Sequence, residues 1–406
     1  MRIVVVGSGG REACLAAVLA RTADVVVTPG NPGIPGSVAT DPAALDADLF
    51  VVGPEQPLVD GLADRLRAAG KLVLGPGADG ARLEGSKAFM KELVEAAGVP
   101  TARYATFTEV EPALAFLRTL PPPWVVKTDG LAAGKGVLVT HDLARAEADV
   151  REKLAGSSFG AAGQTVVIEE GMDGPEVSVF ALCDGTRAVA LEPAQDFKRV
   201  GDGETGPNTG GMGACSPLTW LPAGFTDDIV TRFVQPTLDE LRRRGIDYRG
   251  VLYAGLMLTD DGPKLVEYNI RFGDPDSQVV LLRLTSDLAV HLAEAAAGEL
   301  RTPPTFGADA AVLVVAAAEG YPGPVRSGDV IDGLDAARAS EGATVLCAGV
   351  GVDDDGRLVT AGGRVLDVVG QGPDITTART RAYAALGAIT WPGLLHRTDI
   401  AGEVPQ

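Results

Sequence analysis

The sequence predicts an α/β protein whose first part is a small, doubly wound parallel sheet. Short apolar runs at 3–6, 25–27, 49–52 and 72–74 are each closed by glycine or proline, and helical patterns lie between them. An alternation of strands and helices is typical of parallel sheets with helices on their faces. We therefore expect a doubly wound unit over residues 1–84.

Composition and charge narrow the function classes. The chain has 406 residues, of which 46% are hydrophobic, and its 35 basic and 54 acidic residues give a net charge of -19. A chain of this length folds into roughly two to four domains. Such an acidic balance disfavours nucleic acids and anionic membrane surfaces as partners. An anionic substrate would have to be held by a few local cations.

The cysteines and the N-terminus indicate a cytoplasmic protein. Cys14, Cys183, Cys215 and Cys347 show neither a paired metal-binding spacing nor a disulfide framework. The apolar run at 3–6 is too short for a signal peptide or a membrane span. We therefore expect a reducing, cytoplasmic location.

The first predicted strand ends in a glycine turn, Gly7 to Glu12, that leads into a helical pattern at 13–19. A strand, a glycine turn and a helix N-terminus together form an anion site. The dinucleotide fingerprint is incomplete because Glu12 stands at its third glycine position, which argues against a dehydrogenase. A tight turn without a ligand is the alternative interpretation.

Two segments carry signals of triphosphate binding. Lys127 ends a predicted strand directly before the glycine-rich loop 130–137, which carries a second lysine, Lys135. A strand lysine acts as a point charge and loop amides can cover phosphates, although this is not a Walker A loop. A solvated lysine at a strand end is the alternative. Upstream, a helix is expected from Lys87 to about Ala97.

Acidic and amide side chains follow in two further predicted strands. The strand at 166–172 ends in Glu169 and Glu170, an arrangement suited to adenine and ribose but common in an acidic protein. In the strand at 264–271 the alternation places Glu267 and Asn269 on one face together with Arg271. Carboxylate and amide oxygens suit Mg²⁺ shared with substrate phosphates, and a nearby arginine stabilises anionic charge. A half-exposed strand face is the alternative.

The segment 205–213 is unusually rich in glycine for such a core-rich chain. Glycines let backbone N–H groups approach a ligand, and Asn208 and Thr209 add short polar contacts. Lys198 and Arg199 precede the segment. We expect a loop that wraps an anionic small molecule, against the alternative of a surface turn tightened by glycines.

Taken in order, these motifs resemble the glycinamide ribonucleotide synthetase family of ATP-grasp ligases over nearly the whole chain. The residues that carry the resemblance lie at 53–58, 83–87, 129–137, 195–199, 205–213, 271–275 and 320–323. The resemblance implies an ATP-grasp fold with an N-terminal doubly wound parallel-sheet domain and a C-terminal α/β domain. It implies domains at 1–84, 85–300, with a lid subdomain at about 106–172, and 301–406. The last domain contains the stretch 310–317 and a strand-like pattern at 344–350.

The resemblance also implies site residues, with every role carried over by motif. ATP would be bound by Lys87, Lys127, Gly134, Lys135, Gly136, Glu169, Glu170, Met172 and Glu176. A Mg²⁺ or Mn²⁺ ion would be bound by Glu267 and Asn269. Glycine and the reacting centre would be surrounded by the catalytic residues Asp196, Lys198, Arg271 and Asp274. Substrate would be bound by Gly9, Gly10, Arg11, Asn208, Thr209, Gly210 and Gly211.

The implied reaction is a step of de novo purine biosynthesis. ATP phosphorylates the carboxylate of glycine, and the amino group of phosphoribosylamine then displaces phosphate to form an amide. Such chemistry needs positioning and charge neutralisation more than a nucleophilic side chain. Accordingly, none of His141, His291 and His396 stands beside a candidate nucleophile. The implied partners are small molecules, and a monomer or small homo-oligomer is expected.

The chain departs from the usual family pattern at a few positions. The first loop usually reads Arg-Glu-His-Ala, but here Ala13 and Cys14 follow Arg11 and Glu12. Cys215 stands where tyrosine is common, and Phe197 where histidine is frequent. A divergent paralogue that joins another amine or small acid is therefore the main alternative. A non-catalytic nucleotide-binding regulator is disfavoured because the metal pair and the strand lysine are both present.

Overall fold

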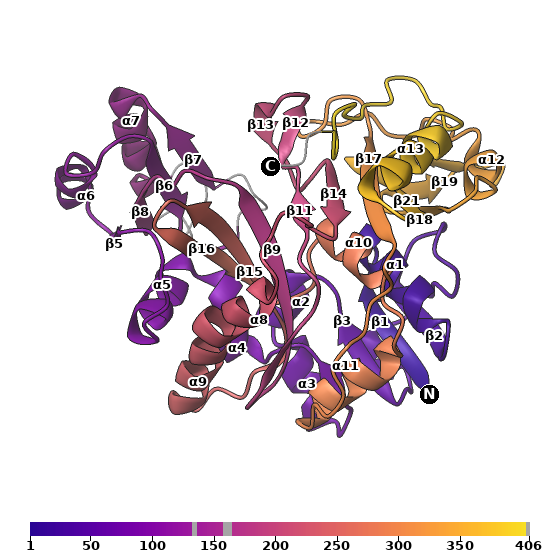
Figure 1. The fold of residues 1–406 in the computed structure, drawn as a ribbon, viewed down its shortest axis with the longest axis horizontal. Helices are drawn as coiled ribbons and strands as arrows, with labels where there is room; N and C mark the ends of the chain where they lie inside the picture. Colours follow the sequence, from indigo (N-terminus) through magenta and orange to yellow (C-terminus); the bar gives the residue numbers. More distant parts are fainter. Residues whose placement is uncertain (132–135, 157–164, 403–406) are drawn as a thin grey trace.

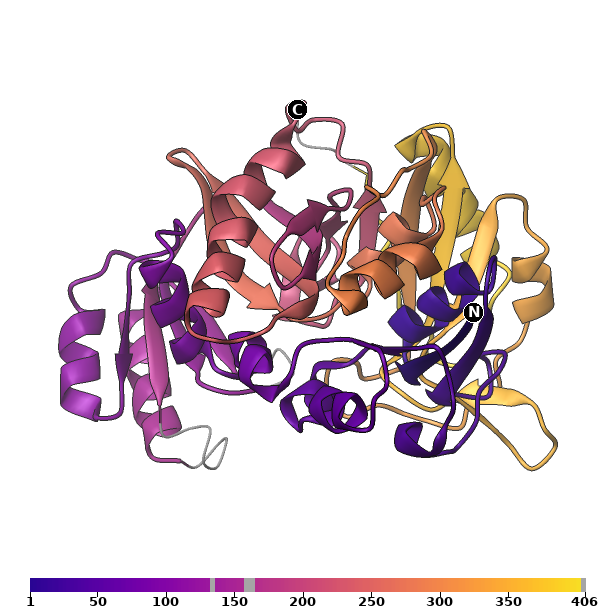
Figure 2. The same ribbon diagram turned by 90° about the horizontal axis from the view of Figure 1, so that it is seen from below.

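The computed structural model describes residues 1–131, 136–156 and 165–402. Within these ranges the strands form three four-stranded sheets, one five-stranded sheet and two two-stranded ribbons. Figure 1 shows a small sheet with two helices at the left, the C-terminal sheet at the upper right and the N-terminal sheet at the lower right. The turned view in Figure 2 again shows the small sheet at the left, apart from the N-terminal and C-terminal sheets at the right.

The N-terminal sheet is parallel, in the order β2-β1-β3-β4. Its strands are β1 (Arg2–Gly7), β2 (Asp24–Pro29), β3 (Leu49–Val52) and β4 (Val73–Leu74). Its helices are α1 (Gly10–Leu19), the short helix η1 (Pro42–Ala44), α2 (Glu55–Val59), α3 (Leu62–Ala68) and α4 (Ala78–Gly85). All four residues of β3 are buried, as expected for a parallel strand covered on both faces. The predicted doubly wound unit is confirmed.

A second, antiparallel sheet has the order β5-β8-β6-β7 and carries two helices on one face. We name this unit the lid, after the subdomain expected from the sequence. Its elements are β5 (Tyr104–Phe107), α6 (Val110–Leu117), β6 (Trp124–Thr128), β7 (Val137–Thr140), α7 (Leu143–Leu154) and β8 (Val166–Glu170). Leu114 and Leu117 of α6 and Val150 of α7 pack on Val126 and Ile168 in a core of its own. This unit therefore has a separate hydrophobic core.

The central sheet has the antiparallel order β10-β9-β15-β16 and faces the lid. Its strands are β9 (Glu176–Asp184), β10 (Ala188–Ala190), β15 (Arg249–Thr259) and β16 (Gly262–Asn269). The associated helices are α5 (Lys87–Ala96), α8 (Phe225–Ile229), the π-helical turn η3 (Val230–Val234), α9 (Gln235–Arg243) and α11 (Leu288–Ala297). Helix α10 (Asp276–Leu281) packs instead on α1, β14 (Gly213–Ser216) and β17 (Ala310–Ala317). Helix α5 begins where Ser86 Oγ accepts the Phe89 N–H, which satisfies one free amide of its first turn.

The C-terminal sheet has the order β11-β14-β17-β21-β18. Its elements are β11 (Gln195–Asp196), β14 (Gly213–Ser216), β17 (Ala310–Ala317), α12 (Leu334–Arg338), β18 (Ala343–Cys347), β21 (Arg364–Gly372) and α13 (Ile375–Leu386), with a ribbon of β19 (Val350–Val352) and β20 (Leu358–Thr360). Strands β11 and β14 precede residue 300 in the chain, so one sheet joins central and C-terminal segments. Asp196 is thereby fixed at its edge.

Two expectations from the sequence need correction. The segment 205–213 is not a continuous loop, because β13 (Thr205–Asn208) pairs with β12 (Arg199–Gly201) in a hairpin. Arg199 donates to the carbonyl of Gly206 and so closes the hairpin, instead of pointing freely at a ligand. The expected strand at 344–350 is interrupted after Cys347, where β18 ends. There Gly349 packs so closely on the backbone of Arg364 and Gly362 that a Cβ atom would overlap it.

Strand β17 lies in the hydrophobic core, whereas the ribbon strand β19 lies at the surface. In the ranges that the structure covers, no helix is long and apolar enough to cross a membrane. The apolar residues lie inside instead, and every residue of β17 is buried. Val314 in this strand is fully buried, whereas Val352 in β19 is 54% exposed.

We expect Val314→Ala to lower the free energy of unfolding by about 2 kcal/mol, because it removes buried methyl groups and leaves a cavity. The matched variant Val352→Ala should change it by less than about 0.5 kcal/mol. Urea unfolding followed by circular dichroism measures both. Equal effects of the two variants would show that β17 is not a core strand.

Candidate active site

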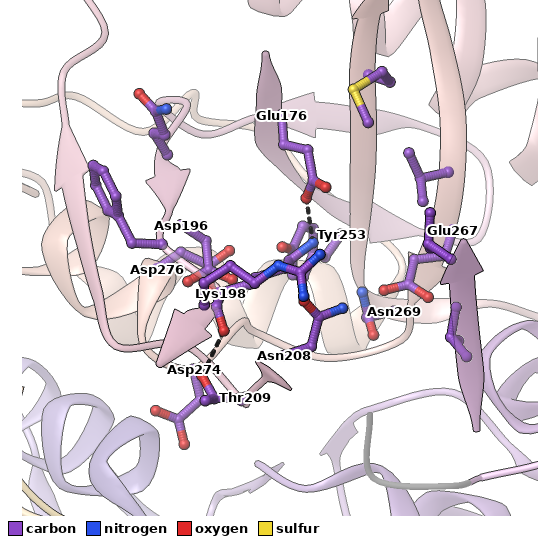
Figure 3. Close-up of a pocket in the computed structure, with 18 of the residues that line it drawn as sticks. Glu176, Asp196, Lys198, Asn208, Thr209, Tyr253, Glu267, Asn269, Asp274 and Asp276 are labelled. Atoms are coloured by element: carbon purple, nitrogen blue, oxygen red, sulfur yellow. Dashed lines mark hydrogen bonds and ion pairs between the residues drawn. The ribbon is translucent and has the colours of Figure 1, made fainter. Parts of the chain in front are cut away.

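A cavity of about 2080 Å³ lies between the lid, the central sheet and the β12–β13 hairpin. It brings together most residues that the sequence singled out, from segments as far apart in the chain as Arg11 and Asp274. Figure 3 shows part of its wall, with Glu176 and Lys198 in contact and Glu267 and Asn269 to one side. The predicted residues that line it are Arg11, Lys87, Lys127, Gly136, Glu169, Glu170, Met172, Glu176, Asp196, Lys198, Asn208, Thr209, Gly210, Glu267, Asn269, Arg271 and Asp274.

Some predicted residues do not line this cavity. Gly134 and Lys135 lie outside the described residues. Of the described ones, Gly9, Gly10 and Gly211 are absent from the wall. Close packing explains the last two: a Cβ atom on Gly10 would overlap Asp367, and one on Gly211 would overlap Pro275. A ligand contact by these glycines stays a prediction.

Glu12 organises the first loop. Its carboxylate accepts the Gly9 N–H at 2.7 Å and the Arg11 Nε–H at 2.6 Å, and the side chain is buried. It also fills the space beside Gly7 and Gly53, where a Cβ atom would lie within 3 Å of it. Gly7 has a φ of +134°, which other residues rarely adopt. An acid at the third fingerprint position therefore has a structural role here.

The strand lysine is part of a buried ion-pair group. Lys127 Nζ lies 2.8 Å from Glu169 Oε1, and Lys91 Nζ lies 2.9 Å from Glu169 Oε2. Although burial opposes it, the two lysines hold the pKa of Glu169 below its usual value. The carboxylate of Glu169 thus serves the lysines rather than pointing freely at a nucleotide. Lys87 donates to the carbonyl of Gly130, and burial lowers its pKa.

The candidate metal ligands lie on one face of β16. Glu267 and Asn269 both line the cavity, and their side chains lie on the same side of it. The residue between them, Tyr268, is buried and its hydroxyl is hydrogen-bonded to Thr237 and to the carbonyl of Phe233. In the described part of the chain, no three His, Cys, Asp or Glu side chains gather as a preformed metal cluster. One carboxylate and one amide fit a Mg²⁺ ion that completes its shell with water and substrate phosphates.

A second ion pair lies across the cavity. Lys198 Nζ is 2.5 Å from Glu176 Oε2, so a predicted ATP-binding residue is paired with a predicted catalytic residue. Although burial alone would lower it, the carboxylates of Glu176 and Asp196 raise the pKa of Lys198. Burial and the neighbouring Asp276 raise the pKa of Asp196 well above its usual value. Lys198 is therefore a permanent cation beside an acid that resists ionisation.

Arg271 bridges the central and N-terminal parts. It follows β16, which ends at Asn269, and donates to Glu84 at 2.7 Å and to Glu55 at 3.2 Å. Glu84 Oε2 also accepts the N–H of Ile270 at 2.9 Å. Burial raises the pKa of Glu84 despite the arginine. The arginine is thus held rigidly by two acids at the rim of the cavity.

The C-terminal sheet adds residues that the sequence did not reveal. Arg364 of β21 lies 3.0 Å from the carboxylate of Asp274 and donates to the carbonyl of Gly210 at 2.7 Å. Tyr321 accepts the N–H of Gly210 at 3.0 Å, and its surroundings at 320–323 did carry a motif signal. Arg364 belongs to no recognisable motif and is far from Asp274 in the chain. No signal in the sequence could therefore have predicted their ion pair.

Comparisons with known proteins agree with this architecture. Profiles of phosphoribosylglycinamide synthetase match residues 1–84 (N domain), 85–277 (ATP-grasp, A domain) and 311–403 (C domain). Phosphoribosylamine–glycine ligases of Streptomyces coelicolor and Caulobacter vibrioides are both 48% identical to the chain, covering 99% and 100% of it and 99% of each relative. The crystal structure of phosphoribosylamine–glycine ligase from Thermotoga maritima matches with a TM-score of 0.89 at 33% identity, over 98% of this chain and 100% of that one. The predicted ATP-grasp fold is confirmed.

The rigid bridge at Arg271 leads to a prediction about stability. We expect Arg271→Met to lower the free energy of unfolding by about 3 kcal/mol at pH 8, because it leaves buried carboxylates unpaired. An unpaired, buried Glu84 has a raised pKa in the folded state, so its penalty grows as pH rises above its unfolded pKa of about 4.3. The loss measured by urea unfolding should therefore be smaller at pH 5.5. The double variant Arg271→Met/Glu84→Gln should recover part of it, and a pH-independent loss would argue against this account.

Proposed function

The chain belongs to the phosphoribosylglycinamide synthetase family, and on this premise we propose that it is an ATP-dependent, ADP-forming ligase that joins glycine to 5-phosphoribosylamine. A carboxylate oxygen of glycine attacks the γ-phosphorus of ATP, and the bond to the departing ADP breaks. The amine nitrogen then attacks the acyl carbon, loses a proton and expels phosphate. The observation that carries the proposal is the cavity in which Lys87 and Lys127 share the wall with Glu267 and Asn269.

The cavity residues supply charge and position for phosphoryl transfer. Lys87 and Lys127 are placed to bind the phosphates, and Glu267 and Asn269 would hold a Mg²⁺ or Mn²⁺ ion that neutralises them. The raised pKa of Lys198 keeps a cation at the opposite wall, where negative charge develops on the acyl phosphate. No nucleophilic side chain is needed, because both attacking atoms belong to substrates.

The acceptor side is assigned to the residues around Asp274. Arg364 holds Asp274 and the carbonyl of Gly210, while Asn208 and Thr209 line the same wall. Although burial opposes it, Arg364 holds the pKa of Asp274 below its usual value, so this acid stays ionised. An ionised carboxylate there can orient an amine substrate. We assign the sugar phosphate to the first loop and Arg11, which lines the cavity.

A second candidate is a paralogue that uses another amine or another small acid. The observation that favours it is Ala13, which stands where family members usually have histidine. Ala13 is buried in α1 and packs into the N-terminal core, so the position has no polar group to offer a substrate. We further propose a cytoplasmic enzyme of de novo purine biosynthesis that acts on small molecules as a monomer or small homo-oligomer.

The experiment that tests the function is an amine-by-acid screen read by ADP release. Glycine and phosphoribosylamine together should give ADP and phosphate, and omission of either should abolish it. Release of AMP and pyrophosphate would contradict an acyl phosphate. Turnover with glycine and a different amine would establish the paralogue, and nucleotide binding without any turnover would establish a regulator.

Glu267→Ala should lower turnover by about two orders of magnitude or more at saturating Mg²⁺, since it removes a carboxylate ligand and leaves phosphate charge unneutralised. A steady-state ADP assay with a Mg²⁺ titration measures this. Asp261→Ala is the matched control, because Asp261 lies at the turn before the same strand and its side chain is 86% exposed. Near-normal turnover of Glu267→Ala would exclude this residue as an essential ligand.

A further inference from the structure

Lys91 is a buried cation that the proposed chemistry does not use. It lies on α5 with no exposed surface, and it is absent from the cavity wall. Its Nζ donates to Thr101 Oγ1 at 2.7 Å and lies 2.9 Å from Glu169 Oε2. Thr101 in turn donates to the carbonyl of Leu265. Lys91 therefore cannot touch a nucleotide in the cavity, but it holds a residue that does contact the strand lysine.

The group formed by Lys91, Glu169 and Lys127 carries one more positive than negative charge, and Glu267 of β16 is the further carboxylate that acts on Lys91. One carboxylate lies between two ammonium groups, and all three side chains are at most 5% exposed. Two cations and one anion leave a net charge of +1 in a buried place. Such a charge is unfavourable for stability unless something else neutralises it. Lys127 and Glu169 both line the cavity, so an anion in the cavity can neutralise it.

We propose that Lys91 is a positioning residue for nucleotide phosphates. From outside the cavity it holds the carboxylate of Glu169 in place, and it thereby sets the position of Lys127 and the net charge of the group formed by these three residues. The inference rests on the proposed function in one respect, namely that the cavity binds a nucleotide. It adds a residue that lies outside the cavity and acts on binding through charge. Replacing Lys91 leaves Glu169 and Lys127 as a neutral pair.

The charge of this group changes with pH in a range that can be measured. Burial lowers the pKa of Lys91 to about 8, against the opposing effect of Glu169. The other groups that face it are Lys127 of β6, Glu267 of β16 and the ring of Tyr104 on β5, 5.5 Å from Nζ. Bound phosphates favour protonated Lys91, so the contribution to affinity is present below pH 8 and lost as pH rises through it.

The test measures binding of MgADP by calorimetry between pH 7 and pH 9.5, where the phosphates of ADP keep one ionisation state. Wild-type affinity should fall by roughly three- to tenfold across this range. Lys91→Met should bind at pH 7 about as weakly as wild type does at pH 9.5 and should show no further fall. Lys153→Met is the matched control, because Lys153 is also buried and paired with one carboxylate, Asp149, but lies on α7 away from the cavity. Its affinity profile should follow wild type.

A second variant keeps the test decisive if Lys91→Met does not fold. Thr101→Val removes an acceptor of the Lys91 ammonium, which lowers its pKa, so the fall in affinity should move to lower pH. A Lys91→Met protein that keeps the wild-type pH profile, or a Thr101→Val protein with an unmoved midpoint, would overturn the inference while leaving the proposed function intact. Failure of wild type to bind MgADP would overturn both.

Discussion

Five cations that line the cavity are held in ion pairs with carboxylates of the chain, and the arrangement of the site depends on these pairs. Lys127 is held by Glu169, Lys198 by Glu176 and Arg364 by Asp274, each within 3.0 Å. Arg11 and Arg271 are paired in the same way, with Glu12 and Glu84. A free lysine or arginine would lose side-chain entropy when it binds a ligand, whereas a paired one is already fixed. The pairs therefore fix cations in position before a substrate arrives.

These pairs also join the parts of the fold. Arg271, after β16 of the central sheet, reaches Glu84 at the end of α4 and Glu55 of α2 in the N-terminal unit. Arg11 donates from α1 to the carbonyl of Phe272. Arg364 reaches from the C-terminal sheet to Asp274. Contacts that orient charged groups of the cavity thus also hold parts of the fold around it, so local changes in charge act on both stability and geometry.

The sequence predicted what depends on local pattern and did not predict what depends on distant pairing. A continuous apolar run predicted β3 to the residue, because a strand buried on both faces consists of apolar residues without interruption. The apolar stretch 310–317 coincides with β17, which is also buried throughout. The glycine-rich composition of 205–213 predicts a loop, but residues 205–208 pair with β12 as a strand, and nothing in the local pattern indicates that pairing. Spacing placed Glu267 and Asn269 on one face, and the structure agrees. The ion-pair partners of Glu169 and Asp274 lie on other elements, and the periodicity of the sequence does not indicate contacts between distant elements.

The strongly negative formal charge of the whole chain does not indicate the local charge inside the cavity. Charges on the outer surface are screened beyond about 8 Å at physiological salt, so the field at a buried site is set by its neighbours. Several acids near the cavity resist ionisation: burial raises the pKa of Glu84 and Asp196, and burial together with Asp274 raises that of Asp367 to about 7. Among the lysines, the neighbouring carboxylates raise the pKa of Lys198, whereas burial lowers the pKa of Lys87 and brings that of Lys91 to about 8. An acidic protein can therefore hold an anionic nucleotide, because the net charge near the cavity differs from the net charge of the whole chain.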